Sequence, residues 1–198
     1  MAVEESRRGR PTAEQREERR ERMLERSLVV FLERGYQASS LDQLARASGV
    51  TKRTIYTDYG DKEGLFSAMV EALAGGISHG SDTTGDTLES LATRIVVRIH
   101  SEELVGLHRL VIAEAPRFPD LARAFYESTD ARHIVALRAH LVHEHGEDAG
   151  ELAPALFSLL LGERHRQRLL GVEGPTSETE ALRIVRDAHR LLGLTPRR

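Results

Sequence analysis

The feature that most constrains this fold is the spacing of its apolar residues, which recur every three to four positions along almost the whole chain. Such spacing places apolar side chains on one face of an α-helix, whereas a half-buried β-strand needs alternating apolar and polar residues. No strand-like alternation is sustained anywhere in the sequence. The pattern therefore predicts an all-α fold of about nine helices without a sheet.

Glycine, proline and capping residues divide this pattern into separate helices. The first helix is predicted to begin near Thr12 and to end at Gly35. Ser40 stands three residues before Gln43, which is the spacing of a capping box and predicts the start of the second helix. The predicted helices after the first span roughly 41–47, 52–58, 62–78, 88–99, 104–111, 121–146, 152–160 and 181–192. A stretch rich in glycine, serine and threonine, 75–85, predicts a loose joint after the fourth helix.

Composition excludes several classes of protein. With 40% apolar and 30% charged residues, the 198-residue chain can bury a globular core. It has no cysteine, which excludes disulfides and thiolate metal sites. No apolar run approaches the roughly 20 residues that a membrane helix needs. The amino-terminal segment is polar and arginine-rich, unlike a secretory signal, so we expect a cytoplasmic protein.

Charge is distributed unevenly along the chain. The formal net charge is −3, but residues 1–62 sum to +2 and residues 63–198 sum to −5. The two lysines of the chain, Lys52 and Lys62, both lie in the basic part. Residues 7–10 read Arg-Arg-Gly-Arg and are either a disordered basic tail or an arm that reaches the DNA backbone or minor groove. This distribution favours a polyanionic partner for the amino-terminal part.

The helices predicted over 41–47 and 52–58 have the pattern of a helix-turn-helix. Ala45 is small enough for the two helices to cross closely, and Gly49 tolerates the positive φ that a tight turn requires. Val50 and Ile55 supply the apolar contacts that hold the second helix over the first. The spacing of these residues predicts that the helix over 52–58 is a recognition helix.

The surface of that helix carries hydrogen-bond donors. Five of them crowd onto its amino-terminal half: Thr51, Lys52, Arg53, Thr54 and Tyr56. Such side chains suit phosphates and base edges at the end of a helix that enters the major groove. The alternative is a solvated helix with a tyrosine at its polar margin.

Residues 19–70, with Ala45, the Gly49–Val50 pair and the TKRTIY stretch, resemble the DNA-binding domain of TetR-family repressors without a gap. The resemblance implies a three-helix DNA-binding helix-turn-helix domain over 1–62 and a helical ligand-binding and dimerisation domain over 63–198. It also implies roles for single residues: base contacts for Thr51, Lys52, Arg53 and Thr54, phosphate contacts for Tyr56 and Lys62, and support of a phosphate contact by Ser40.

The chain departs from the family at one place. The family often has an aromatic residue or histidine at the two positions before Tyr59, where this chain has Thr57 and Asp58. An acidic Asp58 cannot hold a phosphate. We expect it instead to pair with Arg53 or Lys62, or to cap the helix locally.

Residues 107–142 resemble the carboxyl-terminal domain of one TetR subtype, called AefR-like. In the family this domain holds a ligand pocket, and isolated polar groups among apolar residues suit a site that orients a small molecule. The predicted ligand-binding residues, for a small and largely apolar effector, are His108, Arg117, Tyr126 and His133. The alternative for each is a side chain that faces water or caps a helix.

The last two predicted helices, 152–160 and 181–192, pair with their counterparts in a homodimer according to the same resemblance. Ala155, Ser158 and Gly162 place small residues along the first of them, which lets helices approach closely. Two-fold symmetry suits a palindromic operator on double-stranded DNA.

Enzyme and metal signatures are weak. Residues 76–80 match the G-x-S-x-G pattern, but that motif works only between a strand and a helix of an α/β sheet. His140, His143 and His145 have no HExxH motif or cysteine beside them, so we interpret them as a solvated helix end. We predict no enzyme, no catalytic residue, no metal and no cofactor.

Two functions remain from the sequence alone. The first is a repressor that a small ligand releases from DNA, which is favoured by the length of the chain beyond the DNA-binding part. The second is a DNA-binding regulator that senses no small molecule.

Overall fold

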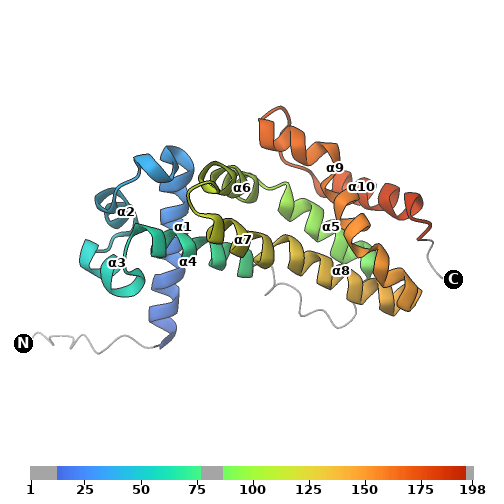
Figure 1. The fold of residues 1–198 in the computed structure, drawn as a ribbon, viewed down its shortest axis with the longest axis horizontal. Helices are drawn as coiled ribbons and strands as arrows, with labels where there is room; N and C mark the ends of the chain where they lie inside the picture. Colours follow the sequence, from blue (N-terminus) through green and yellow to red (C-terminus); the bar gives the residue numbers. More distant parts are fainter. Residues whose placement is uncertain (1–12, 77–86, 195–198) are drawn as a thin grey trace, which may run out of the picture. The chain divides into compact units, whose positions relative to one another are not determined.

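The computed structural model describes residues 13–76 and 87–194, and within these two ranges it contains helices and no strand (Figure 1). The prediction of an all-α fold is confirmed. The chain divides into two compact units, Met1–Met69 and Val70–Arg198. None of the helices in the two ranges is long and apolar enough to cross a membrane.

The first unit contains α1 (Ala13–Ala38), α2 (Leu41–Ser48), α3 (Lys52–Tyr59) and the start of α4 (Lys62–Gly76). Its core includes three aromatic rings: Phe31 and Tyr36 each have their ring centroid 5.0 Å from that of Phe66. Because Phe66 and Met69 of α4 are fully buried, the compact unit extends beyond residue 62, where we predicted the domain boundary.

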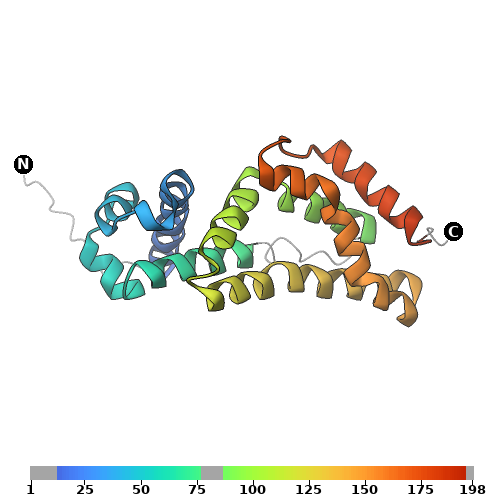
Figure 2. The ribbon, with the colours of Figure 1, turned by 45° about the horizontal axis from the view of Figure 1, so that its top comes forward.

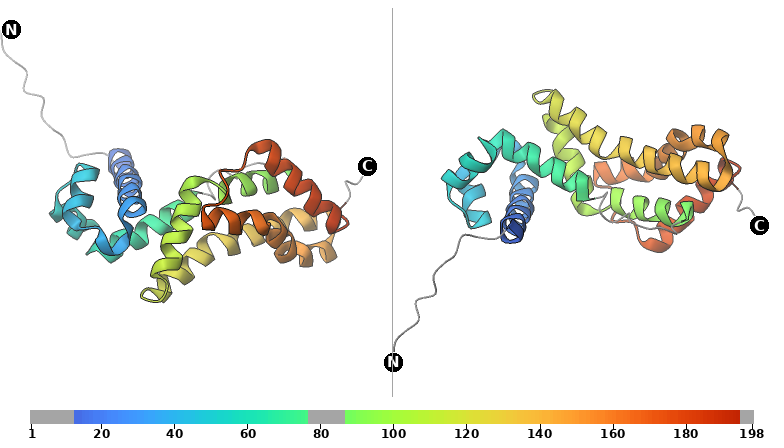
Figure 3. Two further views of the ribbon diagram at one scale, coloured as in Figure 1. Left: turned by 90° about the horizontal axis from the view of Figure 1, so that it is seen from above. Right: turned by 90° about the horizontal axis from the view of Figure 1, so that it is seen from below.

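The second unit contains the remaining elements. They are α5 (Leu88–Ile99), α6 (Glu102–Glu114), α7 (Pro119–Ser128), α8 (Asp130–His145), the 3-10 helix η1 (Glu147–Leu152), α9 (Ala153–Leu170) and α10 (Glu178–Leu191). Helix α5 packs against α6, α8, α9 and α10, and Figures 2 and 3 show it flanked by these helices. It therefore supplies much of the core, through residues such as Leu88, Ala92 and Val96, which are fully buried.

Two helices of the second unit depart from regular geometry. The helix predicted over 121–146 is divided at Thr129, whose φ of −112° and ψ of −84° are not helical. The Thr129 hydroxyl lies 2.7 Å from the carbonyl oxygen of Phe125, and such back-bonding bends helices. Helix α9 is interrupted at Gly162, whose φ of 57° is positive. The glycine-rich joint predicted after α4 falls largely on 77–86, outside the described residues.

Candidate nucleic-acid interface

Local capping defines both ends of α2, including the turn that leads into α3. Ser40 accepts a hydrogen bond from the Gln43 backbone N–H, while the Gln43 side chain accepts one from the Ser40 N–H, so the predicted capping box is present. Helix α2 ends at Gly49, which is left-handed with φ 66° and ψ 29°. The Val50 N–H donates to the Ala45 carbonyl at 3.0 Å, which closes the turn. The Ser40 oxygen serves as the cap, so the hydroxyl proton can still be donated outward.

Helix α3 has one buried and one exposed face. Ile55 is fully buried and Ala45 is 6% exposed, so the apolar residues predicted to join the two helices do lie inside. On the other face Lys52 and Arg53 are exposed, and the Tyr56 side chain is 55% exposed. The donors that the sequence singled out therefore lie together on an accessible surface.

Some of these donors have partners within the protein. The Thr51 hydroxyl caps α3 by accepting from the Thr54 N–H at 3.2 Å, and the two threonine hydroxyls are 3.0 Å apart. Lys52 Nζ forms an ion pair with Asp42 on α2, at 3.0 Å to Oδ1. Because both side chains of this pair are more than half exposed, the pair is worth at most about 1 kcal/mol, and a phosphate can replace the carboxylate.

Lys62 has a structural role in addition to its predicted one. Its Nζ donates to the carbonyl oxygens of Tyr36 at 2.8 Å and Ser39 at 3.0 Å, and lies 4.3 Å from the centroid of the Tyr36 ring. A cation at these carbonyls stabilises the end of α1 and joins it to the start of α4. Its contact with a DNA phosphate stays a prediction.

The sequence reasoning missed Gly64, in the first turn of α4. An added Cβ at this position would stand 1.9 Å from the carbonyl oxygen of Tyr59, the last residue of α3. The Gly64 N–H also donates to Asp61 Oδ1 at 2.8 Å, so Asp61 caps the start of α4. Gly64 thus allows the end of α3 to meet the start of α4. A glycine in the first turn of a helix was the available signal.

Two other predictions about this surface, the local role of Asp58 and the DNA contact of the basic segment, stay predictions. Asp58 is exposed near the end of α3. The basic segment 7–10 lies outside the described residues.

Burial raises the pKa of Tyr59, although hydrogen bonding to Arg20 of α1 opposes this shift. Tyr59 therefore helps to hold α3 on α1.

In the second unit, two of the four predicted ligand-binding residues face inward. His133 is 4% exposed and lies beside Phe157, with ring centroids 5.8 Å apart, while His108 is half-buried. Arg117 is exposed and Tyr126 is 53% exposed. The structure therefore does not bring these four side chains into one site.

His108 instead meets two histidines that the sequence reasoning did not select. Its Nδ1 is 3.1 Å from Nε2 of His165 on α9, and the ring of His165 is 5.6 Å from that of His100 at the end of α5. Burial lowers the pKa of His100, His133 and His165 to about 4 each, and also lowers the pKa of His108. These imidazoles are therefore neutral at pH 7 and offer hydrogen bonds instead of charge.

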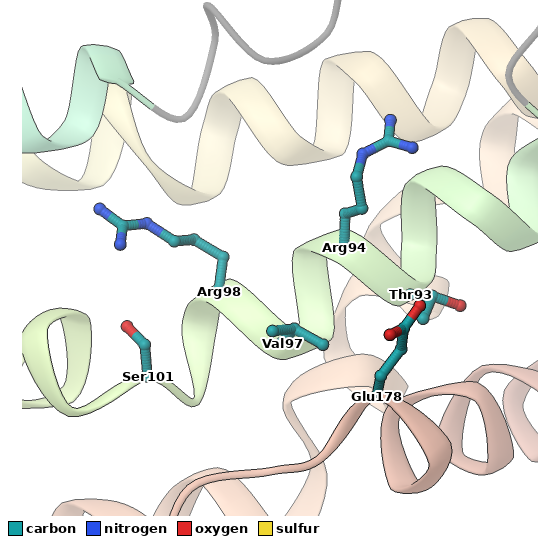
Figure 4. A pocket seen from close by; sticks show the side chains of 6 residues that line it. All are labelled: Thr93, Arg94, Val97, Arg98, Ser101 and Glu178. Atoms are coloured by element: carbon teal, nitrogen blue, oxygen red, sulfur yellow. The ribbon is translucent and has the colours of Figure 1, made fainter.

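A pocket of about 340 Å³ lies elsewhere in the second unit, lined by α5, the start of α6 and α10 (Figure 4). Its lining residues are Thr93, Arg94, Val97, Arg98, Ser101 and Glu178. Figure 4 shows both arginines extending from one side of α5, with Val97 and Glu178 on the side of α10. Arg98 pairs with Glu103 at 3.0 Å. None of the predicted ligand-binding residues lines this pocket.

The predicted dimer helices correspond to α9 and α10. Ala155, Ser158 and Gly162 of α9 are exposed in the single chain, as are the large apolar side chains of Leu170 and Leu191. In the ranges 13–76 and 87–194, no group of three or more histidine, aspartate or glutamate side chains is arranged to hold a metal ion.

Comparison with known proteins agrees with this geometry. Residues 23–69 match the family described as bacterial regulatory proteins of the tetR family. Residues 86–192, more than half of the chain, match the carboxyl-terminal domain of AefR-like transcriptional repressors.

Individual relatives resemble shorter parts of the chain. The transcriptional activator FasR of Mycolicibacterium smegmatis is 32% identical over 84 residues, which are 40% of this chain and 38% of that protein. The transcriptional regulator AcrR of Shigella flexneri is 37% identical over 62 residues, 31% of this chain and 29% of that protein. The chain therefore matches less than half the length of either curated relative.

A solved structure resembles nearly the whole chain. It is a TetR-family transcriptional regulator from Mesorhizobium loti, with a TM-score of 0.76 and 25% sequence identity over 91% of this chain and 96% of that one. The helix-turn-helix geometry, both family matches and this structural likeness lead to one conclusion: the chain belongs to the TetR family of DNA-binding transcriptional regulators and has an AefR-like carboxyl-terminal domain.

Proposed function

We propose that this protein is a repressor that binds a palindromic operator as a homodimer and is released by a small, largely apolar ligand. The observation that carries the proposal is the exposed face of α3, which presents Arg53 and Tyr56 to solvent while Ile55 is buried. The description of the AefR-like family as repressors supports the direction of regulation. The second unit, Val70–Arg198, is much larger than a DNA-binding unit needs, which favours ligand sensing over a constitutive role.

The DNA contacts are tested on an operator selected from random sequences by the full-length protein. Arg53→Ala is expected to weaken the specific complex by about 10- to 100-fold, because a bidentate base contact is worth about 1–3 kcal/mol. Tyr56→Phe is expected to cost less, and equally on operator and random DNA, because phosphate contacts position the protein without specifying sequence. Gel shifts on both DNAs measure this. Unchanged operator affinity in both variants would contradict the assignment of α3.

The proposed homodimer can be tested by a substitution on α9. Ala155 and Ala139 are both exposed helical alanines, on α9 and α8 respectively. Ala155→Glu is expected to yield monomers, because it would bury an unpaired carboxylate in the proposed interface. Ala139→Glu, the matched control, is expected to leave the assembly unchanged. Sedimentation velocity distinguishes the two, and a stable dimer of Ala155→Glu would remove α9 from the interface.

The proposed release by a ligand requires that ligand binding and operator binding be thermodynamically coupled. Helix α4 contributes residues to both compact units, so a shift of this helix can change how the protein meets DNA. A ligand releases the operator only if it binds the DNA-incompetent form more tightly, and a hundredfold preference corresponds to about 2.7 kcal/mol. Operator DNA must then weaken ligand binding by the same factor. Calorimetric titration with and without operator measures this coupling.

A further inference from the structure

The histidine cluster of the second unit, formed by His100, His108 and His165, contains buried ring nitrogens that lack a hydrogen-bond partner among the described residues: both nitrogens of His100 and Nδ1 of His165. His165 is 8% exposed, and its Nε2 is engaged with Nδ1 of His108 at 3.1 Å. Its other nitrogen, Nδ1, is buried and has no hydrogen-bond partner among the residues that the structure describes. Leaving such an atom unpaired costs about 1–3 kcal/mol. The position of Nδ1 therefore points to a group that the folded chain itself does not supply.

The chemistry of the two imidazoles selects the kind of group. Each neutral ring carries one proton, so in the pair one nitrogen donates and the other accepts. If Nε2 of His165 donates to His108, Nδ1 of His165 is left as an acceptor. If His108 donates, Nδ1 of His165 is left as a donor. A hydroxyl group fits both cases, because it both donates and accepts.

The surrounding charges favour an uncharged ligand. Arg168, whose charge acts on His165, donates to the carbonyl oxygens of His100 at 3.2 Å and Glu173 at 2.7 Å. Its Nη2 makes no hydrogen bond among the described residues but lies 3.0 Å from a carboxylate oxygen of Glu102. The positive charge of Arg168 is therefore already balanced by a carboxylate.

Two further neighbours lie beside His108, one acidic and one apolar. The carboxyl of Asp130 acts on His108 and disfavours a second carboxylate nearby. The ring of Phe125, which is 5% exposed, lies 5.4 Å from that of His108 and supplies apolar surface. These surroundings suit a ligand whose body is apolar and whose only polar requirement is one hydroxyl.

We propose that Nδ1 of His165 is the anchor for the hydroxyl group of an uncharged, largely apolar ligand, and that His108 orients this anchor. The inference rests on the proposed ligand sensing and names the chemistry of its ligand. Phenol and toluene are matched probes, because they differ by a hydroxyl in place of a methyl group. Benzoate is the anionic probe of similar size.

Calorimetric titration of the full-length protein with each probe provides the test. Phenol is expected to bind at least tenfold more tightly than toluene or benzoate. His165→Gln can keep a polar partner for His108 but has no atom at the position of Nδ1, so it is expected to bind phenol and toluene equally. The control His140→Gln changes a histidine of α8 whose Nδ1 contacts the Ala136 carbonyl, and it is expected to keep the preference.

A second measurement uses the wild-type protein and therefore does not depend on whether a variant folds. In ¹⁵N spectra of the wild-type histidine rings, phenol is expected to shift the Nδ1 signal of His165, and toluene is not. Equal binding of phenol and toluene by the wild type, binding of neither, or an unchanged preference in His165→Gln would overturn the inference. Binding of phenol that leaves operator affinity unchanged would instead overturn the proposed release while the anchor stands.

Discussion

Gly64→Ala is expected to lower the affinity for the selected operator by at least about 100-fold while the second unit stays folded. The added Cβ would stand 1.9 Å from the Tyr59 carbonyl oxygen, and Cβ contacts below 3.0 Å essentially do not occur in real proteins. The obstructing atom belongs to the backbone, so the end of α3 or the start of α4 must move. Recognition requires side chains held to within about 0.5 Å, and overpacking of this kind costs about 1–3 kcal/mol.

Operator titrations by fluorescence anisotropy, together with circular dichroism, measure this effect. Gly174→Ala is the matched control, because an added Cβ there has nothing within 4 Å and the residue does not have a positive φ. It is expected to bind the operator like the wild type. Wild-type affinity in Gly64→Ala would show that the close backbone contact between α3 and α4 does not position the recognition helix.

Acidification from pH 7 to pH 5 is expected to destabilise the second unit. His100, His133 and His165 each have a pKa lowered from 6.5 to about 4, chiefly by burial and further by the positive charges of Arg98, Arg164 and Arg168. Between pH 6.5 and pH 4 the unfolded chain binds protons at these rings that the folded chain does not. The stability that they contribute is therefore fully present above pH 6.5 and is lost as the pH falls toward 4.

The expected loss between pH 6 and pH 5 is on the order of 3–4 kcal/mol, since each of the three rings contributes slightly less than the limit of about 1.4 kcal/mol per proton and pH unit. This corresponds to a fall of roughly 10–15 °C in the melting temperature of the second unit. Calorimetric melts at several pH values measure it. His133→Leu removes one titrating ring and is expected to reduce the slope, whereas His143→Leu, at an exposed position of α8, is expected to leave it unchanged. A melting temperature that is flat from pH 7 to pH 5 would contradict the prediction.

The helix-turn-helix could be predicted from the sequence because its determinants are local. The capping box of Ser40, the left-handed turn at Gly49 and the cap at Thr51 each depend on residues within four positions along the chain. The burial of Ile55 opposite Arg53 follows from helical periodicity alone. For the same reason the all-helical fold could be predicted.

Breaks within helices were less accessible to sequence reasoning. Threonine and glycine occur inside regular helices, so Thr129 and Gly162 do not by themselves indicate where a helix bends. Gly64 is likewise only a weak helix former by sequence, and its role depends on the Tyr59 carbonyl that the packed structure places beside it.

The sequence by itself therefore determined the fold class, the family and the helix-turn-helix, because periodicity, caps and a contiguous motif act over short distances. Tertiary structure alone decided which polar groups of the second unit lie inside. His100, His108 and His165 belong to α5, α6 and α9 or their ends, and their rings meet only when these helices pack. Tyr126 and His108 both interrupt apolar stretches of the sequence, yet one is exposed and the other half-buried. The physical reason is that burial, and with it the pKa and hydrogen bonding of a side chain, depends on neighbours distant in sequence.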